Sequence, residues 1–308
     1  MKNNKNSLVE AVVGEDSEVE TVDVAPQAGI GKMNFKAKVI KHMERYMADT
    51  LKITEKGLYH HEGEDLLYAH ILPKEKSDYN ILESYRSSYI AYRSMKPITL
   101  HKYFHHLNSS QAMCINYFYP LLKEKRLDVI LSLLGIPGKP VYESACFEKE
   151  SMIEGKNTRN TNFDFYMETT EGKKVYFEIK YTEDDFAKNK MDVEHQVKYL
   201  RTYDNLVKES LAIAEDARNE AFFLQNYQVM RNLLHIDADS YVVFVYPEGN
   251  KVIGHSAHIA KSEMLNEGWK DHLILLTWED LLTYTGSHPD LMAFGDYFTK
   301  DFTKKYMI

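Results

Sequence analysis

Apolar residues recur at two different intervals along the chain, and the interval changes near residue 140. Before that point they lie three or four positions apart, as in Val39, Met43 and Tyr46, which is the spacing of one helix face. Pro97 ends one of these patterns. The spacing predicts helices over residues 33–49, 77–96 and 126–134, and a further helix that starts at residues 109–111.

Beyond residue 140 apolar and polar residues alternate, which is typical of strands with one buried face. A turn at residues 169–172 separates two alternating segments and favours a hairpin. Two later segments are continuously apolar, as expected for strands covered on both faces. The pattern predicts strands over residues 141–150, 161–169, 174–181, 240–246 and 273–277, with helices over 184–235, over 278–284 and from 290 onward.

Composition limits the class of protein. The chain has 308 residues, of which 44% are hydrophobic and 27% charged, as in ordinary globular proteins. Two cysteines, Cys114 and Cys146, are too few for a disulfide scaffold or a four-cysteine zinc module. No apolar run approaches the roughly 18 residues of a membrane span, and Glu10 interrupts the apolar stretch near the N-terminus. We therefore expect a cytoplasmic protein.

Residues 1 to about 32 differ in composition from the remainder. Positions 1–31 hold two lysines against six acidic residues and have no aromatic residue, a composition that favours disorder. We expect a disordered acidic arm over residues 1–32 and a single domain over residues 33–308. Positions 1–31 carry half of the formal net charge of −8, so the total charge argues only weakly against a nucleic-acid partner.

The clearest chemical signal lies on the third predicted strand. Because side chains alternate between the faces of a strand, Val175, Phe177 and Ile179 are expected on one face. Glu178 and Lys180 are then expected side by side on the other face. A carboxylate and an ammonium group on a strand whose opposite face is apolar indicate a candidate reactive site.

Asp164 on the preceding strand can join this pair. A tight turn at Gly172 allows antiparallel pairing to bring Asp164 close to Glu178. Two carboxylates and a lysine suit Mg²⁺, which binds carboxylate oxygens, keeps waters and leaves room for a phosphate. Lys180 can then position or deprotonate the attacking water, or offset phosphate charge. The alternative is an exposed ion pair between Glu178 and Lys180, which contributes little.

The order of these residues resembles the signature of the PD-(D/E)XK, or restriction-endonuclease-like, nuclease superfamily. The segments that carry the resemblance are LNSSQA at 107–112, TNFD at 161–164 and EIKYTEDDF at 178–186. Together they are similar to a bacterial branch of that superfamily over roughly residues 70–285. The D…ExK pattern alone is a weak signal, and three ordered segments are a stronger one. Phe163 stands where the literal motif has proline.

The resemblance implies an α/β fold with a restriction-endonuclease-like core, in which helices flank a mixed central sheet of about four or five strands. We expect an N-terminal helical extension over residues 33–138 and a catalytic core over residues 139–285. The resemblance also implies that Asp164 and Glu178 bind Mg²⁺ or Mn²⁺, assisted by the carbonyl of Ile179. Lys180 would activate the attacking water, and the product would carry a 5′-phosphate.

Further polar residues are candidates for the same site. Glu148, on the strand before Asp164, can add a carboxylate, and an exposed edge-strand residue is the alternative. Gln111 begins a helix at a place where the superfamily often has an acidic or amide side chain near the metal. An ordinary polar helix start capped by Ser109 is the alternative. Gln196, on the helix after the motif strand, can reach the phosphate or the metal-bound water, but a solvated face is the favoured interpretation.

Histidine and cysteine positions give weaker signals. His101 and His105 form an i, i+4 pair that can bind zinc only if a third ligand arrives, and the sequence offers none at a suitable spacing. A structural or DNA-facing role is expected for them. Cys114 is expected to be a buried small hydrophobic residue.

These patterns predict a metal-dependent nuclease that hydrolyses phosphodiester bonds, with DNA as the expected substrate. A homodimer is expected if both strands are cut. One alternative is a catalytically silent module that retains the fold and binds nucleic acid or protein. Another is a hydrolase that uses the same carboxylates on a different substrate. The complete set of Asp164, Glu178 and Lys180 favours the nuclease, because a pure binding module has no reason to hold two carboxylates near a phosphate.

Overall fold

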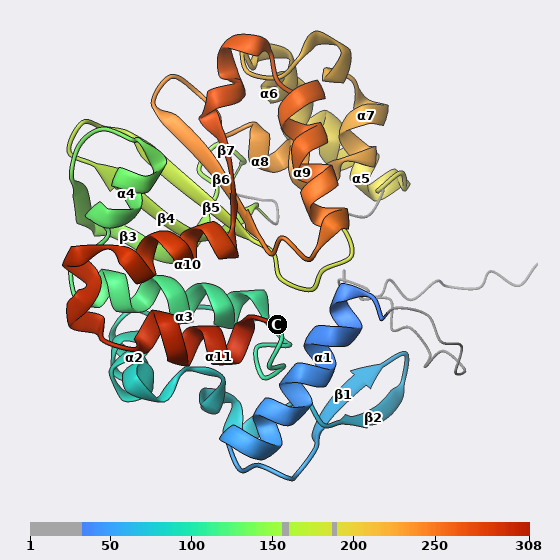
Figure 1. The fold of residues 1–308 in the computed structure, drawn as a ribbon. Coiled ribbons are helices and arrows are strands. Elements are labelled where there is room, and N and C mark those ends of the chain that lie inside the picture. The colour runs from blue at the N-terminus through green and yellow to red at the C-terminus, as the bar shows by residue number, and fades with distance from the viewer. Residues whose placement is uncertain (1–32, 156–159, 187–189) are drawn as a thin grey trace, which may run out of the picture. The chain divides into compact units, whose positions relative to one another are not determined.

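A five-stranded mixed sheet organises the computed structural model, which describes residues 33–155, 160–186 and 190–308 (Figure 1). The order is β3-β4-β5-β6-β7, with antiparallel pairing from β3 to β5 and parallel pairing from β5 to β7. The sheet predicted from the sequence is confirmed, whereas the predicted acidic arm lies outside the described residues. The strands are β3 (Pro140–Glu150), β4 (Asn162–Thr169), β5 (Lys174–Ile179), β6 (Ser240–Tyr246) and β7 (Leu273–Thr277).

Helices precede the sheet, connect its parallel strands and follow it. No helix of the described residues is long and apolar enough to cross a membrane. The α-helices are α1 (Phe35–Arg45), α2 (Glu83–Met95), α3 (Ser110–Lys123), α4 (Asp128–Leu134), α5 (Val193–Lys198), α6 (Asp204–Glu209), α7 (Glu220–Gln225), α8 (Tyr227–Leu233), α9 (Lys251–Glu263), α10 (Trp278–Ser287) and α11 (Thr303–Tyr306). Shorter π-helical turns span Tyr46–Thr50, Tyr199–Tyr203 and Tyr297–Phe302, and 3-10 turns span Lys74–Asn80, Glu215–Ala217, Glu267–His272 and Pro289–Phe294.

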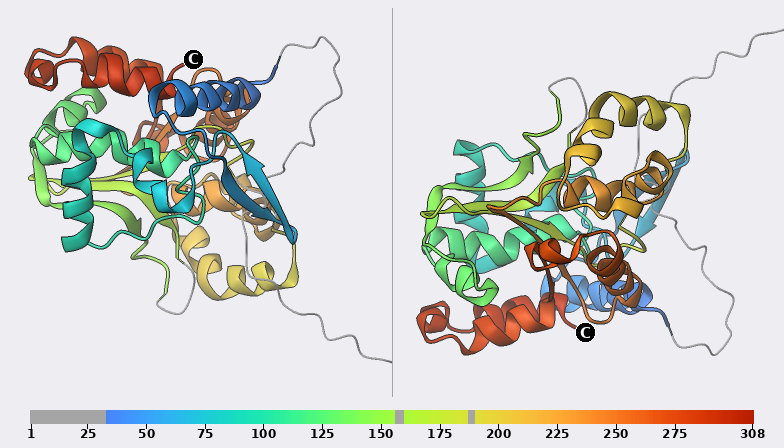
Figure 2. Two further views of the ribbon diagram at one scale, coloured as in Figure 1. Left: turned by 90° about the horizontal axis from the view of Figure 1, so that it is seen from below. Right: turned by 90° about the horizontal axis from the view of Figure 1, so that it is seen from above.

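A separate hairpin of β1 (Gly57–His61) and β2 (Glu64–Tyr68) was not predicted from the sequence. It forms a separate two-stranded sheet that does not join the five-stranded sheet (Figures 1 and 2). Its two-residue turn places both Glu62 and Gly63 at positive φ, 49° and 84°. That turn type usually has asparagine or aspartate before the glycine. Because Glu62 stands there instead, the sequence lacks the usual signal for a hairpin.

Helices cover both faces of the sheet. Val243 and Val245 of β6 join a core cluster that includes α3 and α10, whereas Val242 and Phe244 join a second cluster that includes α8 and α9. Figure 1 shows α3 and α10 on one side of the sheet and α8 and α9 on the other. The continuously apolar sequence of β6 is thus explained by burial on two sides.

Asn80 ties the loop before α3 to the C-terminal helix. Its Nδ2 donates hydrogen bonds to the carbonyls of Phe104 and His106, at 2.6 and 2.7 Å. Its carbonyl accepts a bond of 2.9 Å from Nδ2 of Asn116, and its Oδ1 accepts one of 2.7 Å from Nζ of Lys305. These bonds hold residues 101–109 against α3 and so place that loop at the end of the sheet.

The crossover between β5 and β6 contains α5 to α8, and a buried ion pair anchors its last helix. Nη2 of Arg231 in α8 lies 3.1 Å from Oε2 of Glu154. The same oxygen accepts a hydrogen bond of 2.9 Å from the hydroxyl of Tyr203 and one of 3.1 Å from the amide of Thr161. Burial raises the pKa of Glu154, but the charge of Arg231 and these hydrogen bonds outweigh burial and lower it. Because Glu154 follows β3, the pair ties α8 to the β3–β4 connection.

We expect Glu154→Gln to lower the free energy of unfolding by about 3–5 kcal/mol, because it leaves the buried guanidinium of Arg231 without its counter-charge. Urea unfolding at pH 7 measures the change. Asp204→Asn is the matched control, since it breaks the exposed pair with Lys208 and should cost at most about 1 kcal/mol. Equal losses in both variants would contradict the structural weight given to Glu154.

Three histidines pack together beneath the β1–β2 hairpin. The ring centroid of His106 lies 4.7 Å from that of His105, 6.4 Å from that of His70 and 5.5 Å from that of Tyr59. Within the described ranges, Nδ1 of His70 and Nε2 of His106 are buried without a hydrogen-bond partner. Burial is the main reason why the pKa falls to about 4 for His70 and to about 2 for His106.

This cluster should make the fold sensitive to acid. Below pH 6.5 the unfolded chain takes up protons that the folded imidazoles reject, so stability falls as the pH drops from about 6.5 toward 4, by about 1.4 kcal/mol per pH unit for each histidine. We expect His106→Phe to flatten the plot of unfolding free energy against pH in this range. The exposed His255→Gln should retain the wild-type slope. An unchanged slope in His106→Phe would show that His106 does not cause the acid sensitivity.

Candidate functional site

Glu178 and Lys180 form a buried ion pair at the end of β5. Nζ of Lys180 lies 2.9 Å from Oε1 of Glu178, and the residues are only 7% and 3% exposed. Val175, Phe177 and Ile179 belong to the core cluster that packs against α3, as the alternation predicted. The alternative interpretation of an exposed ion pair is wrong. Two charges removed from water require compensating partners. A buried ion pair is therefore unusual at a strand end and marks this position as a candidate site.

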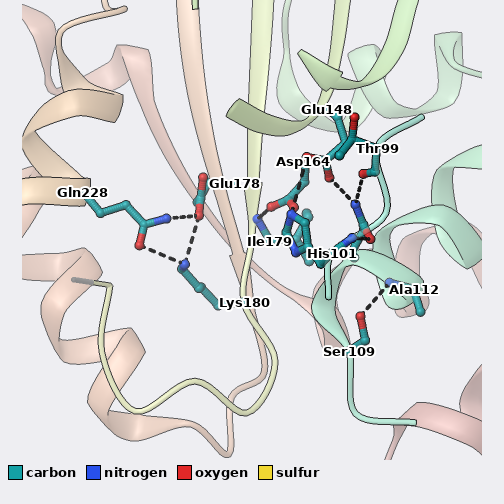
Figure 3. A network of polar contacts seen from close by, with 11 residues as sticks. Thr99, His101, Ser109, Ala112, Glu148, Asp164, Glu178, Ile179, Lys180 and Gln228 are labelled. Atoms are coloured by element: carbon teal, nitrogen blue, oxygen red, sulfur yellow. Dashed lines mark hydrogen bonds and ion pairs between the residues drawn. The ribbon is translucent and has the colours of Figure 1, made fainter. Parts of the chain in front are cut away.

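Asp164 stands where β4 and β5 separate. Phe165 and Phe177 are the last paired residues of these strands, so Asp164 and Glu178 occupy the next positions. Oδ2 of Asp164 accepts a hydrogen bond of 2.6 Å from the amide of Ile179. Figure 3 shows the side chains of Asp164 and Glu178 on opposite sides of β5. The pairing therefore makes the two residues neighbours, while their carboxylate groups point apart.

Burial and neighbouring charges shift the pKa of Asp164. Removal from water raises it well above its usual range, and the negative charges of Glu178 and Glu148 raise it further. The hydrogen bond from the amide of Ile179 acts in the opposite direction. Three carboxylates therefore repel one another at this strand end, and a cation placed among them would stabilise their charged forms.

Lys180 remains an ammonium group at neutral pH. Burial by itself would lower its pKa, but the charges of Glu178 and Glu183 and the hydrogen bond to Glu178 outweigh burial and raise it above its ordinary value. A protonated lysine donates hydrogen bonds and offsets negative charge, but it does not accept a proton. This condition favours positioning of a water or phosphate over direct deprotonation.

Each motif carboxylate is held through one of its oxygens. Oε1 of Glu178 faces Lys180 and also accepts 2.7 Å from Nε2 of Gln228, while Oδ2 of Asp164 is held by the amide of Ile179. Among the described residues, neither Oε2 of Glu178 nor Oδ1 of Asp164 accepts a hydrogen bond. Carboxylate oxygens without a hydrogen-bond partner are the kind of ligand that a hard divalent cation prefers, and one such oxygen lies on each side of β5.

The described residues contain no group of three or more histidine, cysteine, aspartate or glutamate side chains arranged to hold a metal ion. A site formed by Asp164, Glu178 and one main-chain carbonyl has fewer such side chains than this. The zinc interpretation of His101 and His105 fails on position, because His101 faces Glu148 whereas His105 packs against His106.

Gln111 connects the loop before α3 to β3. Its Nε2 donates hydrogen bonds to the carbonyl of Thr99, at 3.0 Å, and to Oε1 of Glu148, at 2.6 Å. Its Oε1 accepts a hydrogen bond of 2.8 Å from the amide of His101. The helix start capped by Ser109 is confirmed, whereas a place for Gln111 near a metal stays a prediction. Gln111 is buried with every polar atom engaged, so its direct effect is to position the loop.

Glu148 lies directly opposite Asp164 in the β3–β4 register, between the Phe147–Phe165 and Lys149–Phe163 pairs. Its side chain is 8% exposed, so the alternative of an exposed edge residue is wrong. Oε1 is held by Gln111, and Oε2 lies 3.4 Å from Nε2 of His101. Its φ of 53° is a left-handed conformation that costs a non-glycine residue about 1–3 kcal/mol, a type of strain that concentrates at functional sites.

Gln228 and His101 both contact residues of the candidate site, and neither contact was predicted from the sequence. Gln228, rather than Gln196, is the glutamine that reaches the motif, and its Oε1 accepts 3.2 Å from Nζ of Lys180. It belongs to α8, far from Glu178 along the chain, and no local pattern marks it. His101 was assigned a structural or DNA-facing role, and the structure places its ring beside Glu148.

A family model described as Restriction Endonuclease associating with ARP matches residues 41–307. The matched range contains the whole five-stranded sheet together with Asp164, Glu178 and Lys180. Searches of curated proteins and of solved structures found no match.

We expect Gln111→Leu to loosen the loop that carries His101, because it removes three hydrogen bonds and leaves the amide of His101 without its acceptor. Hydrogen exchange at the His101 amide should accelerate by about tenfold or more, and the free energy of unfolding should fall by about 1–3 kcal/mol. The control is Gln225→Leu at an exposed position of α7, which should change neither quantity. Unchanged protection at His101 would rule out this positioning role.

Proposed function

The chain belongs to the family described as Restriction Endonuclease associating with ARP, and from that premise we propose that it is a divalent-metal-dependent nuclease that hydrolyses phosphodiester bonds in DNA. Membership in a restriction-endonuclease family indicates a nuclease-like domain that interacts with nucleic acid. The metal, the substrate and the catalytic residues are our proposal.

The observation that carries the proposal is the buried Glu178–Lys180 pair beside Asp164. Asp164 and the Glu178–Lys180 pair occupy neighbouring positions where β4 and β5 part, and each carboxylate has one oxygen without a hydrogen bond among the described residues. A folded protein gains little stability from burying such charges, because desolvation offsets their attraction. Chemistry at this strand end explains their retention better than stability does.

In this proposal Oδ1 of Asp164, Oε2 of Glu178 and the carbonyl of Ile179 would hold Mg²⁺ or Mn²⁺, which requires the two carboxylates to turn toward each other from opposite sides of β5. The ion would act as a Lewis acid on the phosphate and lower the pKa of a bound water. Lys180, as an ammonium, donates a hydrogen bond to the attacking water or to a non-bridging phosphate oxygen. The water oxygen would bond to phosphorus and release a proton to solvent, while the bond to the 3′ oxygen breaks and that oxygen takes up a proton, which leaves a 5′-phosphate and a 3′-hydroxyl.

Glu148 and Gln111 act indirectly in the proposal. Both oxygens of Glu148 and all polar atoms of the Gln111 side chain are already engaged, so these residues position His101 and the loop beside Asp164. The negative charge of Glu148 also adds to the field that attracts a cation.

We also propose the setting in which the enzyme acts. We place it in the cytoplasm, because two cysteines are too few for the disulfide scaffold that is common in small secreted proteins. Cleavage of both DNA strands would require two sites and therefore a homodimer. The family description names ARP as an associate, and we propose that this chain acts together with that partner.

The test is cleavage of supercoiled plasmid and of single-stranded DNA with Mg²⁺ or Mn²⁺. We expect wild type to cut and Lys180→Met to lose about 10²–10⁴-fold in rate, because it lacks the ammonium that contacts the reacting groups. Asp164→Asn should lose activity and weaken Mn²⁺ binding in calorimetry. Chelation of the metal should stop cleavage by wild type.

Lys208→Met, at an exposed position of α6, is the control and should cut at the wild-type rate. Thermal unfolding of every variant separates loss of function from loss of fold. Full activity in Lys180→Met would contradict the assigned site. A folded wild type that binds DNA and cuts neither substrate would instead support the binding module that retains the nuclease fold.

A further inference from the structure

Gln228 lies at the start of α8 and contacts both charged residues of the motif strand. Its Nε2 donates a hydrogen bond of 2.7 Å to Oε1 of Glu178, and its Oε1 accepts one of 3.2 Å from Nζ of Lys180. The direct contact between Glu178 and Lys180, 2.9 Å, completes a closed set of three polar contacts. Figure 3 shows these three side chains together on the side of β5 opposite Asp164.

We propose that Gln228 is a positioning residue that sets the placement of the Lys180 ammonium and the orientation of the Glu178 carboxylate in this site. The proposal rests on the proposed nuclease function and assigns a role to a helix outside the D…ExK motif.

The side-chain amide is suited to this role because it offers a donor and an acceptor at once. The donor meets a carboxylate and the acceptor meets an ammonium, so only one orientation of the amide satisfies both partners. A carboxylate at position 228 would repel Glu178, and an apolar side chain would bind neither group. The lysine side chain has many rotamers, and a second contact to Nζ restricts them.

The arrangement also determines which atoms remain available. The ammonium of Lys180 has three N–H groups, and two of them are directed to Glu178 and Gln228. No further acceptor for Nζ occurs among the described residues, so the third N–H can meet a water or a phosphate oxygen. Because Glu178 receives both donors on Oε1, its Oε2 is left for a cation.

The position of Gln228 is built into the fold. Arg231 lies one helical turn further along α8 and forms the buried ion pair with Glu154, whose side chain is 1% exposed. Tyr227, beside Gln228, packs its ring at 5.2 Å from that of His195. These contacts anchor α8 on both sides of the glutamine, so its amide is aimed before any ligand arrives.

The test compares Gln228→Leu, which keeps the side-chain size and removes both contacts, with Gln228→Glu, which keeps an acceptor for Lys180 and removes the donor to Glu178. Gln225→Leu, at an exposed position of α7, is the matched control. Single-turnover cleavage with saturating DNA and Mg²⁺ measures the chemical step, and DNA affinity with Ca²⁺ measures binding. A ¹H–¹⁵N spectrum of the lysine ammonium groups, with Lys180 assigned by Lys180→Arg, reports the placement of Nζ without turnover.

We expect Gln228→Leu to slow the chemical step by about 10–100-fold while DNA affinity changes by less than about twofold. The Lys180 ammonium signal should shift or vanish in Gln228→Leu and persist in Gln228→Glu, although the glutamate variant also cleaves slowly. The control should match wild type in all three measurements.

A wild-type rate and an unchanged ammonium signal in Gln228→Leu would overturn the proposal while leaving the nuclease function intact. Parallel losses of rate, DNA affinity and thermal stability would also overturn it, because they would show a merely structural role. If wild type does not cut, the proposed function fails, and the ammonium spectrum still upholds or overturns the placement of Lys180 by Gln228.

Discussion

The ion pair between Glu178 and Lys180 is buried at the end of a strand, and the arrangement around it follows from that constraint. Charges withdrawn from water cost several kcal/mol per ion unless hydrogen bonds and close pairing compensate them. Gln228 supplies the compensation on one side, and it can do so only because α8 is anchored by Glu154 and Arg231. The stability of the helical crossover and the geometry of the candidate site are therefore coupled.

The two sides of β5 draw on different parts of the chain. On one side the crossover helices deliver Gln228 to Glu178 and Lys180. On the other side the loop before α3 brings His101 to Glu148, beside Asp164 (Figure 3), and Gln111 at the start of α3 bonds to both His101 and Glu148. Both groups lie at the point where β4 and β5 stop pairing, and further along the strands the ladder runs between two separate apolar clusters.

Much of the fold could be predicted from local patterns. The strands predicted over residues 240–246 and 273–277 have the observed bounds, because a short, continuously apolar run has few other ways to be buried. The helix start at Ser109 was also predictable from its capping residue. The helix α9 was missed, since Gly254 and two histidines weaken the helical pattern, and the hairpin β1–β2 was missed because Glu62 occupies an unusual turn position.

The sequence by itself determined the alternation that places Glu178 and Lys180 on one face of β5 and an apolar row on the other, because strand geometry dictates that alternation. It also determined that Asp164 would be a neighbour of Glu178, through the hairpin register. Only the tertiary structure decided where the side chains point and what they meet. The carboxylates lie on opposite sides of β5, and Gln228 arrives from a distant helix, because burial and long-range packing leave no local trace in the chain.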